Sequence, residues 1–437
     1  MKLNLRDRKG VILIVSYLAI TVLLTISAVF ALRLNHEKNL ALRDKNTIYA
    51  LDIAEAGLDR GLLWLRDQSS PPSGTALFYP IGTSPQSLGS GTYLISIDPD
   101  DSNPSRSLKR YKIISVGTVA GIAKQLANEV QIDTYARFAF FTDTEHFRWY
   151  GWYRIPIWFS GGDVIEGPTQ TNSHFHIYHD PVFDGTVNAS DNYLTFYNNG
   201  YYLDTTATSN PPYDMPVFEQ GITLGYEELD MPSKALDLRT ASVQGGLKLT
   251  GPTTVVLNAD STMNVTNSHQ GWNNKNMPLP ANGAFFVDGG NLTVSGTLNG
   301  QLTMGTNKNV VIANNVTYAD DPRLNPNSDD TLGLIAEKDV VISQNAPYNV
   351  EVDASIMALG NSFIVENWYS GPPKGTLTTY GGIIQRERGP VGTFNGSTGQ
   401  KLSGYSKDYN YDTRLMASPP PFYPTTGDYI SLSWTEE

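Results

Sequence analysis

The chain has 437 residues, which is enough for more than one domain. Its formal net charge is −12, and a strongly acidic chain is a poor general binder of nucleic acid, so we expect no nucleic-acid partner. Because it contains no cysteine, its stability must come from burial and backbone pairing rather than from disulfides. Only 17% of the residues are charged and glycine and proline are common, a composition typical of short strands joined by tight turns.

The first feature along the chain is an uncharged run at residues 11–32. At about 1.5 Å rise per residue, this run matches a hydrocarbon core of roughly 30 Å. A buried core helix would carry a polar face, and a cleavable signal would have a shorter apolar stretch closed by small residues. We therefore predict a transmembrane helix. A basic leader at residues 1–10 precedes it and few basic residues follow, so the N-terminus is expected in the cytoplasm.

The helix is predicted to continue to residue 67 as an amphipathic segment. Its apolar side chains step by three and four residues, as expected for a stripe that packs on a soluble domain. The members of this stripe are Ile48, Leu51, Ala54, Leu58, Leu62 and Leu65. Serines and prolines at 69–72 end the pattern.

The N-terminal residues RKGVILIVSYL, followed at a distance by YALDIAEAGLDRG, resemble the PilX-type minor type IV pilins and their pseudopilin relatives in type II secretion. The resemblance implies a prepilin peptidase that cuts between Gly10 and Val11. It also implies other pilin-like subunits as partners of the assembly helix. The fifth residue after the bond is usually glutamate in major pilins and is Val15 here, which indicates a minor subunit at a filament tip or a chain that is never cut.

The same resemblance implies a location in the bacterial inner membrane. The chain would span it once, in contact with lipid before assembly. The bulk of the protein would be periplasmic or extracellular on a filament.

Residues 68–137 are predicted to form a pilin-like β head. Strand patterns occur at 93–98, 111–119 and 122–135, and the last two are separated by Ala120-Gly121, a short turn signal. We expect a small antiparallel sheet that packs on the helix stripe. The fold class is thus α+β, with a large all-β domain after this head.

The large β domain is predicted at 138–425, followed by a C-terminal tail at 426–437. Between Leu292 and Asn314, strand starts recur every eight to ten residues, too closely for intervening helices, which favours a β-solenoid and leaves a β-sandwich as the alternative. Residues 331–424 and 162–187, which include LGLIAEKDVVI and GDVIEGPTQTNSHFHIYHDPVFDGTV, resemble a C-terminal module of unassigned function found on proteins with PilX-like N-termini.

Residues 138–159 are unusually aromatic. Exposed rings would form a platform for sugar stacking or partner docking. The alternating polar residues instead favour strands with one buried face. The proline-rich segment at 419–424 is open to a similar pair of interpretations, as a polyproline ligand or as a stiff segment laid back on the β domain.

Two groups of residues suggest metal ions, although no metal or other cofactor is predicted. Calcium is possible where oxygen ligands cluster, at 98–103 and around Asp320, Asp321, Asp329 and Asp330, but polar turns explain the same pattern. The three candidates for a transition metal are His174, His176 and His179. Structural hydrogen bonding is the alternative that we prefer for them.

The enzymatic alternative is a polysaccharide-cleaving β-helix. Its candidate residues are Arg386, Glu387 and Arg388, together with Glu351 and Asp353 on one strand face. Peptidase, lipase and phosphate-loop motifs do not occur, so we expect association rather than catalysis.

The function predicted from the sequence is that of a minor pilin-like component that displays its β domain for assembly initiation, adhesion or substrate contact. A surface or a polysaccharide is the expected ligand. The alternative is a signal-anchored envelope protein with a carbohydrate-binding or carbohydrate-cleaving β-helix.

Overall fold

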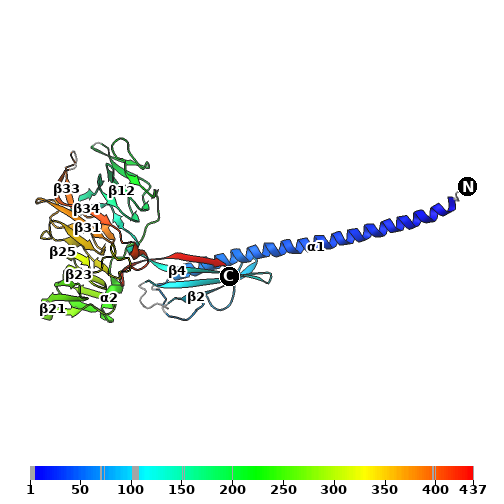
Figure 1. The fold of residues 1–437 in the computed structure, drawn as a ribbon, viewed down its shortest axis with the longest axis horizontal. Helices are drawn as coiled ribbons and strands as arrows, with labels where there is room; N and C mark the ends of the chain where they lie inside the picture. Colours follow the sequence, from blue (N-terminus) through cyan, green and yellow to red (C-terminus); the bar gives the residue numbers. More distant parts are fainter. Residues whose placement is uncertain are drawn as a thin grey trace. The chain divides into compact units, whose positions relative to one another are not determined.

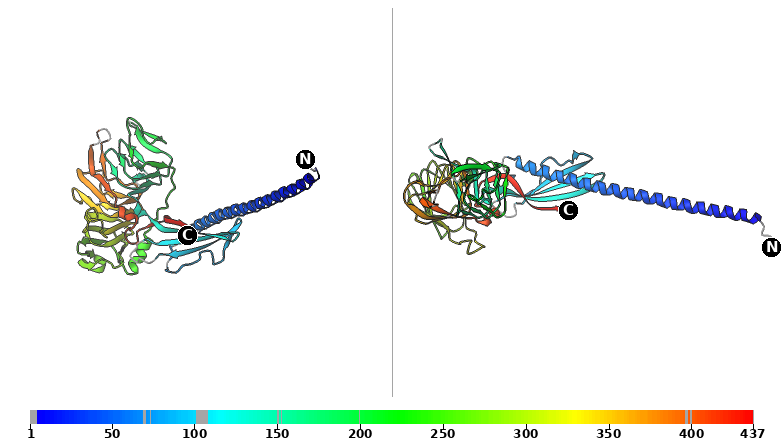
Figure 2. Two further views of the ribbon diagram at one scale, coloured as in Figure 1. Left: turned by 45° about the vertical axis from the view of Figure 1, so that its right-hand side comes forward. Right: turned by 90° about the horizontal axis from the view of Figure 1, so that it is seen from above.

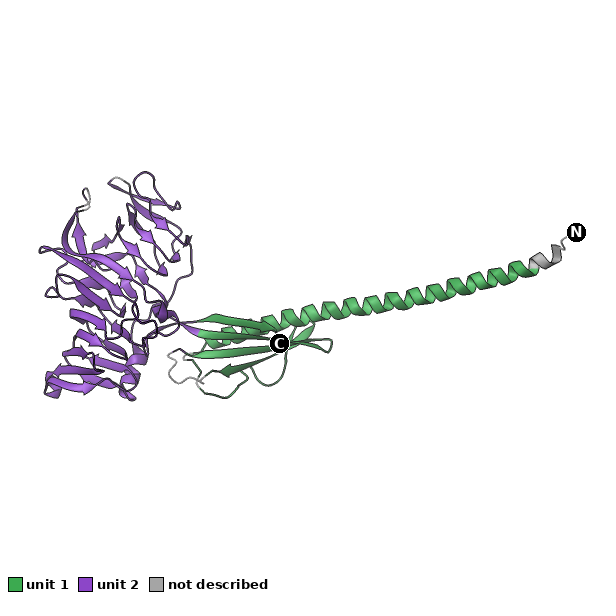
Figure 3. Ribbon diagram, in the orientation of Figure 1, with its two compact units in different colours: residues 1–103, 109–131, 429–437 green, residues 104–108, 132–428 purple. Residues whose placement is uncertain are grey.

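The computed structural model describes residues 5–68, 71–72, 74–100, 108–149, 151, 153–198, 200–395, 398 and 400–436, with the backbone alone for 5–9 and 198. The chain forms two compact units (Figure 3). Unit 1 comprises residues 1–103, 109–131 and 429–437, and unit 2 comprises 104–108 and 132–428. The sequence placed the boundary at 137 and a tail at 426–437, whereas residues 429–437 belong to unit 1 because they continue a strand of its sheet.

Unit 1 contains one long helix and one sheet with the strand order β1-β2-β3-β4-β35. Its elements are α1 (Leu5–Arg66), β1 (Gln86–Leu88), β2 (Gly91–Pro99), β3 (Arg110–Val119), β4 (Ile122–Thr134) and β35 (Thr425–Glu436). The pairs β1–β2, β2–β3 and β3–β4 are antiparallel. The predicted hairpin is confirmed, since Val119 lies opposite Ile122 and both turn residues have positive φ, 49° at Ala120 and 80° at Gly121.

The helix packs on this sheet through small residues. The buried face includes Ala50, Ala54, Gly57, Leu58, Gly61 and Leu65. On the sheet side, β3 presents Gly117, where an added Cβ would lie 2.1 Å from the carbonyl oxygen of Ala50. The missing side chains therefore let the backbones of α1 and β3 approach closely.

The buried face of α1 follows most of the predicted stripe. Ala54, Leu58 and Leu65 are buried and Leu51 and Leu62 are half-buried, but Ile48 is 57% exposed. The prediction was wrong at Ile48, the N-terminal member of the stripe, because Ala50 is the first buried residue among the described side chains of α1.

Residues 10–45 of α1 are exposed, and the helix runs as one uninterrupted rod in Figures 1 and 2. Gly10 and Val11 are exposed, and Val15 is 60% exposed. Within the described residues, α1 is the one helix long and apolar enough to cross a membrane. This helix is consistent with a membrane anchor or a signal, and residues 1–4 of the predicted leader lie outside the described part.

Unit 2 consists of mostly parallel sheets, which differ from the antiparallel sheets of a β-sandwich. A ten-stranded sheet has the order β17 (Ile222–Leu224), β13 (Val187–Ala189), β10 (Thr169–Thr171), β5 (Phe140–Thr144), β32 (Ile383–Glu387), β29 (Ser355–Ala358), β26 (Thr331–Ala336), β24 (Gln301–Thr306), β22 (Ala284–Asp288) and β18 (Leu247–Thr250).

A second, 14-stranded sheet runs alongside it. Its main order is β16 (Val217–Phe218), β12 (Val182–Phe183), β9 (Val164–Ile165), β34 (Lys401–Asn410), β31 (Pro373–Tyr380), β28 (Val350–Asp353), β25 (Val310–Tyr318), β23 (Leu292–Leu298), β19 (Thr253–Asn258), β20 (Thr262–Asn267) and β21 (Trp272–Pro278). Its side branches are β27 (Val340–Ile342), β30 (Phe363–Val365) and β33 (Gly392–Phe394).

Smaller elements complete unit 2. A four-stranded sheet contains β15 (Tyr201–Thr205), β14 (Leu194–Asn198), β11 (His176–Tyr178) and β8 (Phe159–Ser160), and a hairpin contains β6 (His146–Trp149) and β7 (Tyr153–Pro156). The helical elements are α2 (Leu236–Val243) and the short 3₁₀ turns η1 (Tyr135–Arg137), η2 (Ser268–Gln270) and η3 (Thr413–Met416).

The chain order of unit 2 divides it into two arms that meet in the middle of its sheets. The short arm, residues 138–224, runs outward from β5 and β9, and the long arm, residues 247–410, returns from β18 to β32 and β34. The arms join where β5 pairs with β32 and β9 pairs with β34, both in parallel. We call these two pairings the seam. Figure 1 shows β23, β25, β31 and β34 following one another within the long arm.

The interior of unit 2 is mainly aliphatic in the long arm and is richer in aromatic side chains in the short arm. In the short arm, the ring of Phe183 lies 5.0 Å from Phe159 and 5.1 Å from Phe218. The aromatic segment at 138–159 therefore contributes to the core at both of its ends, as its alternation predicted. Its middle forms the β6–β7 hairpin, in which Tyr150 and Trp152 lie outside the described residues.

The outer face of the ten-stranded sheet is covered by α2 and by loop residues, which form a second apolar cluster. The proline-rich segment belongs to this cover. Tyr423, Pro419 and Pro420 are buried while Phe422 is exposed. The segment is thus laid back on the β domain rather than free as a polyproline ligand.

Candidate functional site

The seam carries charged side chains from both arms. At its centre, Arg388 Nη1 lies 2.7 Å from Glu145 Oε2, and the two side chains are 3% and 0% exposed. The guanidinium also donates to the carbonyl of Ile157 at 3.2 Å and lies 3.5 Å from the centroid of the Phe159 ring. This pair is therefore a buried structural contact that joins residues 243 positions apart.

Further ion pairs follow the same seam. Arg386 Nη1 lies 3.3 Å from Asp143 Oδ2 and its Nε donates to the carbonyl of Leu359 at 2.6 Å. Glu387 pairs with Arg148 at 2.9 Å. The predicted catalytic cluster at 386–388 is thus engaged residue by residue in ion pairs across the seam.

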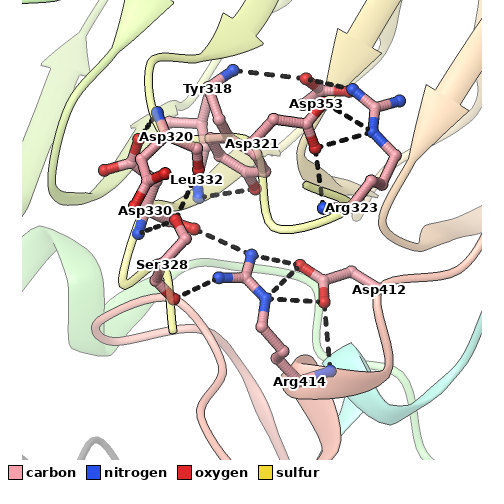
Figure 4. Close-up of polar contacts among 10 residues, drawn as sticks. All are labelled: Tyr318, Asp320, Asp321, Arg323, Ser328, Asp330, Leu332, Asp353, Asp412 and Arg414. Carbon is pink, nitrogen blue, oxygen red and sulfur yellow. Dashed lines mark hydrogen bonds and ion pairs between the residues drawn. The ribbon is translucent and has the colours of Figure 1, made fainter. Parts of the chain in front are cut away.

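Two of the aspartates proposed for calcium have side chains held by other groups, Asp321 by a guanidinium group and Asp330 by backbone N–H groups (Figure 4). Asp330 accepts hydrogen bonds from the backbone N–H of Gly300 at 2.6 Å and of Asp320 at 2.9 Å. Arg414 donates to the carbonyl of Asp330 at 3.0 Å and pairs with Asp412 at 2.6 Å. Cationic and N–H donors thus occupy the positions where oxygen ligands would have faced a metal ion.

Two of the other calcium candidates are less enclosed. Asp329 is exposed, and Asp321 pairs with Arg323 at 2.8 Å, which holds the pKa of Asp321 below its usual range. The predicted calcium loop at 98–103 lies outside the described residues from position 101 onward.

Asp353 is the most perturbed carboxyl group of this cluster. Burial raises its pKa to about 7, although Arg323 Nη2 lies 3.3 Å from Oδ2 and opposes the shift. Oδ2 also accepts from the backbone N–H of Tyr318, whereas the buried Oδ1 has no hydrogen-bond partner among the described residues. Glu351, the other carboxylate on this strand face, pairs with Arg323 at 2.9 Å.

Three histidines do come together, but the third is not the predicted one. The ring centroid of His176 lies 4.9 Å from that of His174 and 4.7 Å from that of His146. His179 lies apart from them, with Nδ1 3.3 Å from the carbonyl of Tyr213. The sequence did not identify His146 because its place depends on how the β6–β7 hairpin folds beside β11.

The histidine cluster is uncharged in its buried part. Burial lowers the pKa of His176 to about 2 and also lowers the pKa of His146. His174 Nδ1 lies 2.8 Å from Asp191 Oδ2. Among the residues that the structure describes, no three His, Asp or Glu side chains are placed to hold a metal ion.

A pocket of about 580 Å³ lies in unit 2 where the two arms meet, and we call it the seam pocket. Its aromatic lining residues are Trp158, Tyr178, Trp368, Phe394 and Tyr405, and its charged lining residues are Asp163, Lys401 and Lys407. A smaller hollow of about 180 Å³ is bounded by Trp158, Tyr178, Tyr197 and Phe394. The aromatic segment identified in the sequence supplies Trp158, while the other rings come from distant strands and loops and were missed.

Residues 110–191 match a family model described as a domain of unknown function, DUF4900. No curated protein sequence matches. A solved structure described as the competence-associated pilin ComZ from Thermus thermophilus is 12% identical, with 90% of this chain and 97% of that chain covered and a TM-score of 0.33. A TM-score below 0.5 does not establish a shared fold.

Proposed function

We propose that the protein is a minor pilin-like or pseudopilin-like component of a type IV pilus or a type II secretion-like filament. The observation that carries the proposal is α1 itself. This helix continues without interruption from Leu5 to Arg66, with an exposed apolar N-terminal part and a C-terminal part packed on an antiparallel sheet. An apolar helix surface of this length needs lipid or other helices around it.

The length of α1 supports an assembly helix over a simple anchor. About 20 apolar residues suffice to span a membrane. Here the same helix extends far beyond residue 32 and ends in the part that packs on the sheet. One continuous helix therefore joins the apolar N-terminal part to the head. Contacts made by the N-terminal part with neighbouring subunits would therefore fix the direction of the whole helix. Val15 fits a minor rather than a repeating subunit.

We also propose that unit 2 is a β-solenoid whose surface contacts a substrate, a cell surface or other minor subunits. The parallel pairing of β22 with β24 and of β24 with β26 supports this description, as does the single apolar cluster that runs through the interior. The proposed mechanism is association rather than catalysis. Its support is that Arg386, Glu387 and Arg388 are each engaged in ion pairs.

The proposed location is the bacterial inner membrane, with the N-terminus in the cytoplasm and the bulk of the chain periplasmic or displayed on a filament. Before assembly, lipid would surround residues 11–32. Prepilin peptidase and other pilin-like subunits would be the partners of the helix.

The experiment is to express the full chain with its cognate prepilin peptidase and to determine the N-terminus of the recovered protein by mass spectrometry. The proposal predicts a mature chain that begins at Val11, and no such product from a Gly10→Val variant or from cells with an inactive peptidase. Recovery of only intact or distally clipped protein would contradict it. The alternative, a signal-anchored envelope protein with a carbohydrate-binding or carbohydrate-cleaving β-helix, would then take its place, favoured by the aromatic seam pocket.

A further inference from the structure

The walls of the seam pocket are built from aromatic side chains of both arms. The ring of Tyr178 is stacked with Phe394 at 5.8 Å and lies 5.3 Å from Tyr197, while Trp158 lies 5.6 Å from Tyr197. Trp368 lines the same pocket from the long arm. An aromatic face carries negative potential, whereas the C–H groups of a sugar ring carry partial positive charge, so these flat walls suit the apolar faces of sugars.

The charges in the pocket favour a negatively charged ligand. Lys407 Nζ is neutralised by Asp163 Oδ2 at 2.6 Å. Lys401 Nζ donates instead to three neutral acceptors, the carbonyls of Lys374 and Gly375 and Ser406 Oγ, so no carboxylate among the described residues neutralises its charge. Two lysines and one aspartate leave one net positive charge among the lining residues, in a chain whose net charge is −12.

Polar groups are interspersed with the rings. The hydroxyls of Ser160, Thr393 and Ser406 belong to the lining. The volume of about 580 Å³ lies inside the range of about 300–1,000 Å³ that is usual for ligand pockets. Aromatic rings for stacking, hydroxyls for hydrogen bonding and the uncompensated positive charge of Lys401 are together features that suit an acidic sugar.

From this combination we infer that the seam pocket binds a glycan chain that carries carboxylates, such as an oligomer of uronic acids. A quaternary ammonium ligand would also suit aromatic rings, but the lysines repel it. A nucleic acid would need many more cationic contacts along its backbone. This inference does not depend on filament assembly, so it stands or fails separately from processing at Gly10.

The test uses the full chain in detergent micelles, with a short oligogalacturonate as probe and a neutral oligosaccharide of equal length for comparison. Isothermal titration calorimetry should show saturable binding of the oligogalacturonate. Because Trp158 and Phe394 supply stacking faces, Trp158→Ala and Phe394→Ala should each weaken binding about tenfold. Lys401→Gln should reduce the preference for the acidic over the neutral probe.

Tyr226→Ala removes an exposed ring outside the pocket lining and is the matched control, expected to bind like the unmodified chain. Thermal unfolding of each variant shows whether it is folded, and Phe394→Ala keeps the test valid if Trp158→Ala unfolds. The inference is overturned if oligogalacturonate does not bind saturably, or if folded pocket variants bind it as tightly as the control. Tighter binding of a quaternary ammonium probe would also overturn it.

Discussion

The buried pair Arg388–Glu145 allows a quantitative test of how the two arms of unit 2 are joined. The two side chains are 3% and 0% exposed, so removing one partner leaves the other charge in the interior without compensation. Breaking such a pair costs about 3–5 kcal/mol of unfolding free energy. We therefore expect Arg388→Met or Glu145→Leu alone to destabilise unit 2 by about this amount.

The double variant Arg388→Met/Glu145→Leu should behave differently from the sum of the single variants. With both charges replaced by apolar groups, no uncompensated charge remains. The double variant should therefore lose less unfolding free energy than either single variant. Denaturant unfolding of the full chain in detergent, followed by the fluorescence of its tryptophans, measures all three. Arg33→Met, at an exposed pair on α1, is the control and should change stability by less than about 1 kcal/mol. The reasoning would be refuted if the double variant lost the sum of the unfolding free energies lost by the single variants, or if the single variants lost no more than Arg33→Met.

Two further predictions concern other parts of the chain. Gly117→Ala should destabilise unit 1 by about 1–3 kcal/mol, because its Cβ would meet backbone atoms of α1, and an unchanged unfolding transition would contradict the packing described above. The second prediction is that Asp353 makes stability depend on pH. Burial raises its pKa to about 7, so between about pH 4 and 7 the folded state holds a proton that the unfolded state has released. The contribution of Asp353 to the unfolding free energy should therefore fall as pH rises through this window, by up to about 1.4 kcal/mol per pH unit. Denaturant titrations at several pH values measure this dependence, and the unfolding free energy of Asp353→Asn should change less with pH than that of the unmodified chain. An equal pH dependence in the two proteins would contradict the prediction.

Local features of the fold were predictable because they depend on neighbouring residues. The turn at Ala120-Gly121 follows from the tolerance of these residues for positive φ between two strand patterns. The apolar helix follows from composition alone. The stripe of α1 was predicted correctly at Ala54, Leu58 and Leu65, but its close approach to β3 was not predictable, because that depends on glycine on both partners, which carries no hydrophobic signal.

Features that depend on the seam were not predictable from the sequence. Arg388 reads as an exposed charge next to Glu387, and nothing local indicates that Glu145, 243 residues away, will be buried beside it. The same holds for the seam pocket, in which Trp158 and Phe394 meet only after both arms have folded. Sequence spacing within the histidine group likewise gave no sign that His146 would replace His179.

The proposed packing of the apolar half of α1 among the helices of other subunits can be tested by site-specific cross-linking. Because the chain has no cysteine, a single one at Leu18, which is 63% exposed on α1, can carry a photoactivatable cross-linker. A cysteine at Leu324, which is 85% exposed in unit 2, is the control. In sheared filaments, the account predicts adducts to other pilin-like subunits from position 18 and none from position 324. Protein that stays wholly in the membrane fraction and forms adducts only with lipid would contradict the account.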